Sequence, residues 1–220
     1  MKNDPKVVSV NIGKREPIRI GKETTETGIN KQPIHSSVSI EKHGLVDDVI
    51  ADKENHGGVD QAVYLYSLED YAWWSKTLQA DLSPGTFGEN LTIAGLDFTS
   101  LRIGDRFQIN DVLLEVTFAR IPCATLAARM ENPTFVKRFA EANRPGAYTR
   151  VLSTGTVQTN DQVSFIPASE NYPTVIELFK VWYVKDRDPA LLQQGLAAPI
   201  AERARGAFKF WLGEDSSHLF

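Results

Sequence analysis

The sequence predicts a mainly β fold with some α-helix: a β-barrel of short strands, followed by a small all-α part of three helices. Up to residue 167, most apolar segments are short. Their polar and apolar residues alternate, or they are rich in β-branched residues, and glycine-rich turns separate them. After residue 167, the apolar residues recur at helical spacing. Closing or nearly closing the strands into a barrel would remove exposed sheet edges. We therefore expect a β-barrel domain over residues 1–167 and a three-helix domain over residues 168–220.

The first predicted strand covers residues 6–13, where valine and isoleucine precede a glycine. Residues 36–42 alternate polar and apolar side chains, which is typical of a half-buried strand. The segment 62–66 is rich in aromatic and β-branched residues and predicts a further strand. Ser67 then has the right side chain to cap a helix, in which apolar residues recur at helical spacing up to residue 78.

A hairpin is predicted over residues 106–120, because two alternating segments flank Asn110 and Asp111, which tolerate turn conformations. The remaining elements expected before residue 167 are helices over 123–130 and 133–143, the second with Pro133 in its first turn, and a strand–turn–strand over 146–166.

Three helices are predicted beyond a linker at 167–173. They cover residues 174–184, 188–196 with Asp188 as N-cap, and 199–212 starting at Pro199. About fifty residues form too small a core to be stable alone. We therefore expect these helices to pack on one another and on the barrel, or on a second subunit in a homodimer.

Composition excludes several kinds of site. The net charge of −4 disfavours nucleic-acid binding, which usually needs a basic excess. The single cysteine excludes an intrachain disulfide, a protein-held iron–sulfur cluster and a zinc site with several thiolates. Charged residues near the start disfavour a signal peptide, and no apolar segment approaches membrane-spanning length. We expect a cytoplasmic protein with no membrane partner.

Cys123, in the segment ARIPC, is the first candidate functional residue. A free cysteine taken alone is more often buried packing. This one lies at a predicted strand-to-helix junction, three residues after Arg120. A helix N-terminus and a nearby arginine both stabilise a thiolate. A thiolate suits either a nucleophile or a ligand of a soft metal.

Four other loops carry candidate binding residues, and each also has a purely structural interpretation. His56 and Asp60 lie in HGGVDQAV, which is either a tight turn or a binding loop. Asn90 follows a Gly-x-x-Gly turn whose amides can hold an anion. Tyr148 and Arg150 share a strand face, and an arginine there binds either a phosphate or a surface carboxylate. The fourth loop contributes Lys31, in TGINKQPI.

The order of these segments is more specific than any one of them, and it resembles the MOSC domain, named after the C-terminal part of molybdenum-cofactor sulfurase. The bacterial subfamily linked to 6-hydroxylaminopurine resistance is the most similar. The resemblance rests on TGINKQP, HGGVDQAVYLYS, GTFGENLTIAGL, LRIGDRFQI, LEVTFARIPC and RPGAYTRVL. It covers about residues 7–167, and the three C-terminal helices resemble the small all-α domain of that subfamily. Ala119 departs from the pattern, since the subfamily usually has proline there.

The resemblance implies a molybdenum cofactor of the molybdopterin type, with chemistry independent of pyridoxal phosphate. Cys123 stands at the position of the family's invariant cysteine, so it is the expected metal ligand and catalytic residue. Counter-charges for the pterin phosphate are expected from Lys31, Arg120 or Arg150, and contacts to the pterin or substrate from His56, Asp60 and Asn90. The expected cofactor-binding residues are thus Lys31, His56, Asp60, Asn90, Arg120, Tyr148 and Arg150.

The implied reaction is the two-electron reduction of a small N-hydroxylated substrate, such as a hydroxylamino purine or an amidoxime, to an amine. A separate flavin- or ferredoxin-type protein would supply the electrons, because the chain shows no Gly-x-Gly-x-x-Gly nucleotide motif. Three alternatives are compatible with the sequence: a sulfur carrier with a persulfide on Cys123, a non-catalytic molybdopterin-binding module, and a barrel in which Cys123 is structural.

Overall fold

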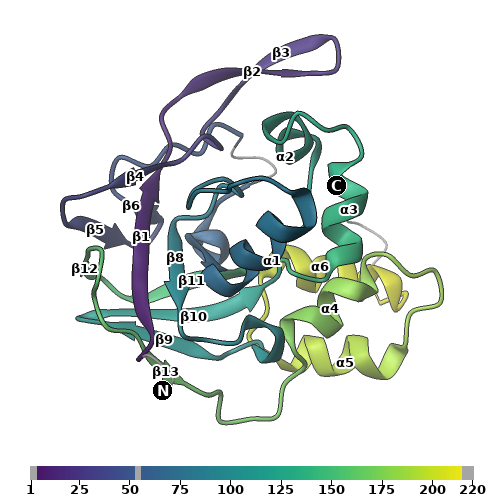
Figure 1. Cartoon of the computed structure of the whole chain (residues 1–220). Helices are drawn as coiled ribbons and strands as arrows, with labels where there is room; N and C mark the ends of the chain where they lie inside the picture. Colours follow the sequence, from purple (N-terminus) through teal and green to yellow (C-terminus); the bar gives the residue numbers. More distant parts are fainter. Residues whose placement is uncertain (1–3, 53–55, 215–220) are drawn as a thin grey trace.

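The computed structural model describes residues 4–52 and 56–214, and its strands lie mainly in one eight-stranded sheet (Figure 1). All neighbours in this sheet pair antiparallel except β7 and β8, which are parallel. In spatial order the strands are β13 (Ser164–Ile166), β9 (Arg106–Ile109), β10 (Val112–Phe118), β11 (Ala147–Ser153), β7 (Val63–Ser67), β8 (Leu91–Ala94), β1 (Lys6–Ile12) and β4 (Gln32–Ile34). The predicted strands at 6–13 and 62–66, and the hairpin at 106–120, are confirmed.

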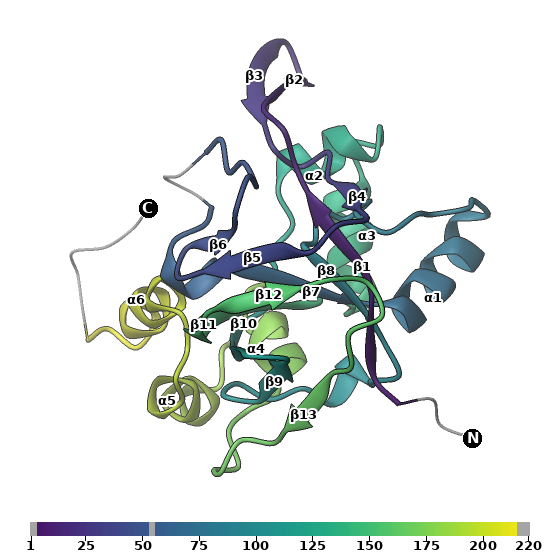
Figure 2. The same cartoon turned by 90° about the vertical axis from the view of Figure 1, so that its left-hand side faces the viewer.

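Two smaller sheets complete the strands. One consists of β12 (Gly155–Val157), β5 (Val38–Glu41) and β6 (Gly44–Leu45), so the predicted strand at 36–42 is confirmed. The other is a hairpin of β2 (Glu16–Ile20) and β3 (Glu23–Thr27), which projects from the body of the molecule (Figures 1 and 2). This hairpin was not predicted, because β3 is largely exposed and has no apolar residue, and the half-buried Ile18 and Ile20 of β2 are too short a pattern to indicate a strand.

Closure of the large sheet into a barrel is not confirmed. Its edge strands β13 and β4 do not pair with one another among the described residues. Each has only three residues, and Pro33 in β4 has no N–H to offer a neighbour. Instead, the segment before β13 bonds to the start of β1: the Val7 amide donates to the Asp161 carbonyl at 2.9 Å, and the Val163 amide to the Pro5 carbonyl at 2.8 Å.

The described residues contain six α-helices and two short 3-10 helices. Ser67 caps the first helix as predicted, since its hydroxyl accepts from the Asp70 amide at 3.2 Å. The helices are α1 (Leu68–Leu78), α2 (Ala124–Arg129), α3 (Phe135–Ala142), α4 (Val175–Val181), α5 (Pro189–Ala197) and α6 (Glu202–Trp211), and the 3-10 helices are η1 (Val59–Gln61) and η2 (Phe98–Ser100).

Two helix starts differ from the prediction. Thr134 is the N-cap of α3, so Pro133 precedes the helix instead of occupying its first turn. Pro199 likewise lies before α6, which begins at Glu202 after the N-cap Ala201. The Glu202 amide donates to a carboxylate oxygen of Asp60 at 2.8 Å, and this side chain from a distant loop fixes where the helix begins.

Helices α4, α5 and α6 lie together on one side of the sheet (Figures 1 and 2). An aromatic cluster joins them to β10: the ring of Phe118 lies 5.3 Å from that of Trp182 and 6.1 Å from that of Phe208. Trp211 packs against Trp182 at 4.8 Å, so the two tryptophans cover each other. The helices therefore share apolar contacts with the sheet, while a domain boundary at residue 167 stays a prediction.

A second aromatic cluster packs between α1, α3 and the loop that contains Phe87. Trp74 of α1 is buried and stacks on Phe139 of α3 at 5.9 Å, with Phe87 and Phe135 also in contact. This cluster fixes the loop that contains Phe87, which borders the candidate site described below. None of the described helices is long and apolar enough to cross a membrane.

Phe208→Ala should lower the free energy of unfolding by about 3–5 kcal/mol, because Phe208 is fully buried between α6, α4 and β10. Urea unfolding followed by tryptophan fluorescence and by circular dichroism should give one coincident transition. Val184→Ala is the control, since Val184 is exposed and should change stability by no more than about 0.5 kcal/mol. Two separate transitions, with only one affected by Phe208→Ala, would show that the helices fold independently of the sheet.

Candidate functional site

One cavity brings together six of the residues singled out in the sequence. It has a volume of about 100 Å³ and lies where the ends of several loops meet. The six residues on its wall are Lys31, His56, Asn90, Arg120, Cys123 and Tyr148. They come from segments far apart in the chain, from Lys31 to Tyr148. Folding therefore brings these residues together, and no local sequence motif contains them.

Cys123 lies at the junction predicted for it, between the end of β10 at Phe118 and the start of α2 at Ala124. It is the N-cap of α2 and has an extended backbone. Its side chain is half-buried and faces the cavity, while apolar neighbours pack on its other side. The thiol is therefore accessible from the cavity and is not enclosed in the core.

The surroundings of Cys123 favour the thiolate. Burial opposes ionisation, but a hydrogen bond from the His56 side chain and the positive charge of Arg120 outweigh it, aided by the Leu126 amide. Together they lower the pKa of the Cys123 thiol to about 6. His56 also lies beside a carboxylate, with its Nδ1 3.4 Å from an oxygen of Asp52. His56 thus contacts both the Cys123 thiol and the Asp52 carboxylate.

Arg120 is a cation held beneath this cavity. Its side chain is only 5% exposed, and its guanidinium lies 5.2 Å from the centre of the Tyr64 ring. One terminal nitrogen donates to the Phe87 carbonyl at 2.6 Å, whereas the buried Nε has no hydrogen-bond partner in the described part of the chain. Burial alone would lower the pKa of Arg120, but Tyr148, Tyr64 and the Cys123 sulfur raise it above its usual range. Arg120 therefore stays charged.

A buried carboxylate, Asp48, organises the opposite wall. It accepts hydrogen bonds from the Lys31 ammonium, from Asn90 Nδ2 at 2.9 Å and from the Gly13 amide at 2.7 Å. Burial lowers the pKa of Lys31 despite the attraction of Asp48. Asp48 was not among the residues predicted from the sequence, because an acidic residue beside another acid in a loop gives no signal of burial. Lys31 is thus neutralised within the protein.

Asp60 and Arg150 do not join the other predicted residues. Arg150 lies 2.8 Å from one carboxylate oxygen of Asp60, and its other terminal nitrogen lies 3.6 Å from Glu115. These two carboxylates draw the guanidinium into a second cavity, which Asp60 also lines. Of the three counter-charges expected from the sequence, only Arg120 faces Cys123 without a carboxylate partner of its own.

Glycine at the cavity wall has a specific steric reason. Gly88 has a φ of +76°, and a Cβ there would lie 2.9 Å from Ile29 Cγ1 and 3.3 Å from an Arg120 terminal nitrogen. A side chain at this position would therefore strain the backbone and push Arg120 away from its place. The glycine-rich loop GTFGEN thus supports the position of Arg120.

The pH dependence of alkylation measures the state of Cys123. The rate of reaction with iodoacetamide should rise with pH and reach half its maximum at about pH 6, since the thiolate is the nucleophile. His56→Gln should move this midpoint to higher pH by removing the imidazole hydrogen bond. His43→Ala, a change at an exposed histidine outside the cavity, should leave it in place. A wild-type midpoint near 9.0 would contradict the arrangement described.

Comparison with known proteins supports the fold and the family. A Bacillus subtilis protein named YflK is 32% identical over 92% of both chains. A Gibberella moniliformis protein named Reductase is 29% identical over 89% of this chain, which corresponds to 35% of that longer protein. The crystal structure of YiiM from Geobacillus stearothermophilus superposes with a TM-score of 0.79 at 24% identity, covering 94% of this chain and 99% of that one.

The family model described as the MOSC domain matches residues 52–164, just over half of the chain. This range contains His56, Asn90, Arg120, Cys123 and Tyr148, which are five of the six predicted residues on the cavity wall. The chain belongs to the MOSC domain family.

Proposed function

We propose that this protein is a molybdenum-cofactor-dependent reductase that converts small N-hydroxylated compounds, such as hydroxylamino purines and amidoximes, to amines. Cys123 would be the protein's ligand to molybdenum. The observation that carries the proposal is the Cys123 side chain facing the cavity, with its pKa lowered to about 6 beside the buried Arg120. The relative named Reductase adds support for redox chemistry.

The residues present fit the metal-binding end of such a cofactor. A thiolate suits a metal that is already bound to sulfur, and Cys123 is ionised at neutral pH. The buried Nε of Arg120 lacks a partner in the described structure, as expected of a donor meant for an anionic ligand. At about 100 Å³ the cavity is smaller than the roughly 300 Å³ or more of typical ligand sites, so it suits the metal end and not a whole pterin.

The cofactor, when bound, supplies the two-electron chemistry. The reduction of R–NHOH to R–NH₂ and water consumes two electrons and two protons. The protein's own residues would provide a fixed thiolate at Cys123, positive charge from Arg120, and a hydrogen-bond donor to the sulfur at His56. Asp52, facing Nδ1 of His56, would keep the ring oriented.

Electrons would come from a separate flavin- or ferredoxin-type protein. The chain has one cysteine, too few for an iron–sulfur cluster of its own.

A sulfur carrier is the second candidate, and the order Cys123–His56–Asp52 favours it. A thiolate activated by an imidazole that faces a carboxylate is the arrangement of a sulfur nucleophile. In this function, the Cys123 thiolate would attack the outer sulfur of a sulfane donor such as thiosulfate. The S–S bond of the donor breaks, sulfite leaves, and Cys123 keeps the outer sulfur as a persulfide, which an acceptor thiolate then removes to restore the Cys123 thiolate.

Metal and pterin analysis tests the first function. Protein expressed with molybdate should contain both in proportion to the chain, and Cys123→Ala should lose the molybdenum while its circular dichroism spectrum is unchanged. With a chemical reductant, the wild type should reduce 6-hydroxylaminopurine, whereas Cys123→Ala should be inactive. His43→Ala should match the wild type in every measurement. A wild type without molybdenum and pterin would refute the reductase, and bound cofactor without turnover would leave only a binding module.

Mass spectrometry of the intact protein tests the second function. After incubation with thiosulfate or a cysteine desulfurase, a sulfur carrier should gain the mass of one sulfur atom, removable by dithiothreitol. His56→Gln should slow this gain in mass, because the Cys123 thiol of that variant ionises less readily. An unmodified Cys123 under these conditions would rule the carrier out.

A further inference from the structure

A second cavity, of about 420 Å³, lies beside the Cys123 cavity and has no part in the proposed function. The two cavities share η1 and β11. Gln61 and Tyr148 line the first, whereas Asp60 and Arg150 line the second. We propose that this second cavity binds a small organic oxyanion, a carboxylate or phosphate ester with an apolar body, whose charged group lies beside Lys42.

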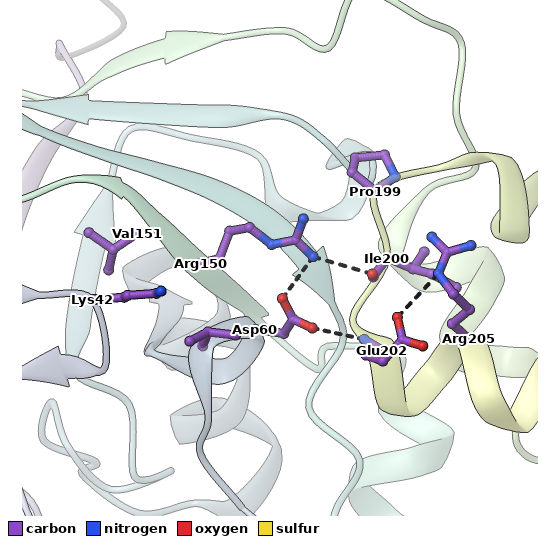
Figure 3. Close-up of a pocket in the computed structure, with 9 residues that line it drawn as sticks. Lys42, Asp60, Arg150, Val151, Pro199, Ile200, Glu202 and Arg205 are labelled. Atoms are coloured by element: carbon purple, nitrogen blue, oxygen red, sulfur yellow. Dashed lines mark hydrogen bonds and ion pairs between the residues drawn. The ribbon is translucent and has the colours of Figure 1, made fainter.

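The walls come from four parts of the fold, and η1 contributes Val59 and Asp60 (Figure 3). Lys42 comes from the turn between β5 and β6, Arg150 from β11, and Glu202 from the start of α6. In Figure 3 the Lys42 side chain extends toward Asp60 and Arg150. The volume falls within the roughly 300–1,000 Å³ typical of small-molecule sites.

The charges of the wall leave one cation unmatched. Arg205 is occupied, because its terminal nitrogens donate to the Leu196 carbonyl at 2.6 Å and the Ala198 carbonyl at 2.9 Å. Arg150 is held by Asp60, as described above. Lys42 lines the cavity, is exposed, and forms no ion pair with any described residue. An anionic ligand therefore finds an available cation there, whereas a cationic ligand finds no available carboxylate on the wall.

The carboxylates of the wall are already used within the protein. Asp60 accepts from Arg150 at one oxygen and from the Glu202 amide at the other, both at 2.8 Å. Glu202 lies 3.5 Å from Arg205. These contacts also fix the walls in place without a ligand, so the cavity is formed before binding, which limits the entropy lost on association.

Apolar side chains on the cavity wall indicate that the ligand has an apolar body besides its charged group. Val59, Val151, Pro199 and Ile200 line the cavity between the charged groups. Val59 is 41% exposed, so it presents apolar surface to solvent that a ligand would cover. Inorganic phosphate meets only the charged half of this surface, whereas a chain of several carbons with a terminal oxyanion meets both halves.

Isothermal titration with four probes tests the proposal: hexanoate, hexyl phosphate, hexylamine and inorganic phosphate. Hexanoate and hexyl phosphate should bind, inorganic phosphate should bind at least about tenfold more weakly, and hexylamine should not bind. The stronger of the two hexyl anions identifies the head group. Failure of both hexyl anions to bind at millimolar concentration would overturn the proposal.

Lys42→Glu is the decisive variant, because Lys42 is exposed and its replacement leaves the core intact. It should weaken hexanoate binding about tenfold or more and create binding of hexylamine. Lys209→Glu, an equal charge change on the exposed face of α6 outside the cavity, should keep the wild-type preference. Hexanoate binding that Lys42→Glu leaves unchanged would assign the probe to another site, such as the cavity of Arg120, and refute this one.

Discussion

The buried carboxylate of Asp48 is the contact on which the candidate site depends. It connects four segments distant in the chain: its own loop, the end of β1 through the Gly13 amide, the loop of Lys31 and the loop of Asn90. Replacing such a buried pair by apolar groups is often harmless, but removing one partner leaves an uncompensated charge and costs about 3–5 kcal/mol. Asn90 extends the network, because its amide oxygen accepts from the Tyr64 backbone of β7 at 3.1 Å. The wall opposite Cys123 is thus held by one charge and its three donors.

Cys123 and Arg120 occupy the other wall, where burial has opposite effects on two groups that stabilise each other. Burial alone raises the pKa of the thiol and lowers that of the guanidinium, so it disfavours the charged form of each group. The His56 hydrogen bond and the charge of Arg120 reverse the effect on the thiol, and Tyr148, Tyr64 and the Cys123 sulfur reverse it on the guanidinium. Gly88 and the Phe87 carbonyl keep Arg120 in place, and Phe87 is itself fixed by the aromatic cluster around Trp74. The chemistry of the sulfur thus depends on packing in a distant part of the core.

Elements with a strong local signal were predictable, and contacts between distant segments were not. The Ser67 cap, the hairpin around Asn110 and the position of Cys123 between strand and helix all follow from neighbouring residues. The start of α6 does not, because Asp60 fixes it from about 140 residues away. The same applies to Lys31 and Arg150, whose charges are neutralised by Asp48, Asp60 and Glu115. Sequence patterns identify a cation, but only the fold shows whether a carboxylate already holds it.

This difference explains why two neighbouring cavities favour different ligands. Both are lined by cations, yet internal carboxylates neutralise Lys31 in the first and Arg150 in the second. What remains for a ligand is Arg120, beneath a half-buried thiolate, in the first and the exposed Lys42, beside apolar surface, in the second. A buried guanidinium acts in a low dielectric and suits a ligand that enters the cavity, whereas an exposed ammonium is screened by solvent and needs an apolar body on the ligand to add affinity. Residue type alone would predict the same kind of anion for both cavities. The two cavities differ because the available cation is buried in the first and exposed in the second, and because carboxylates already pair with the other cations.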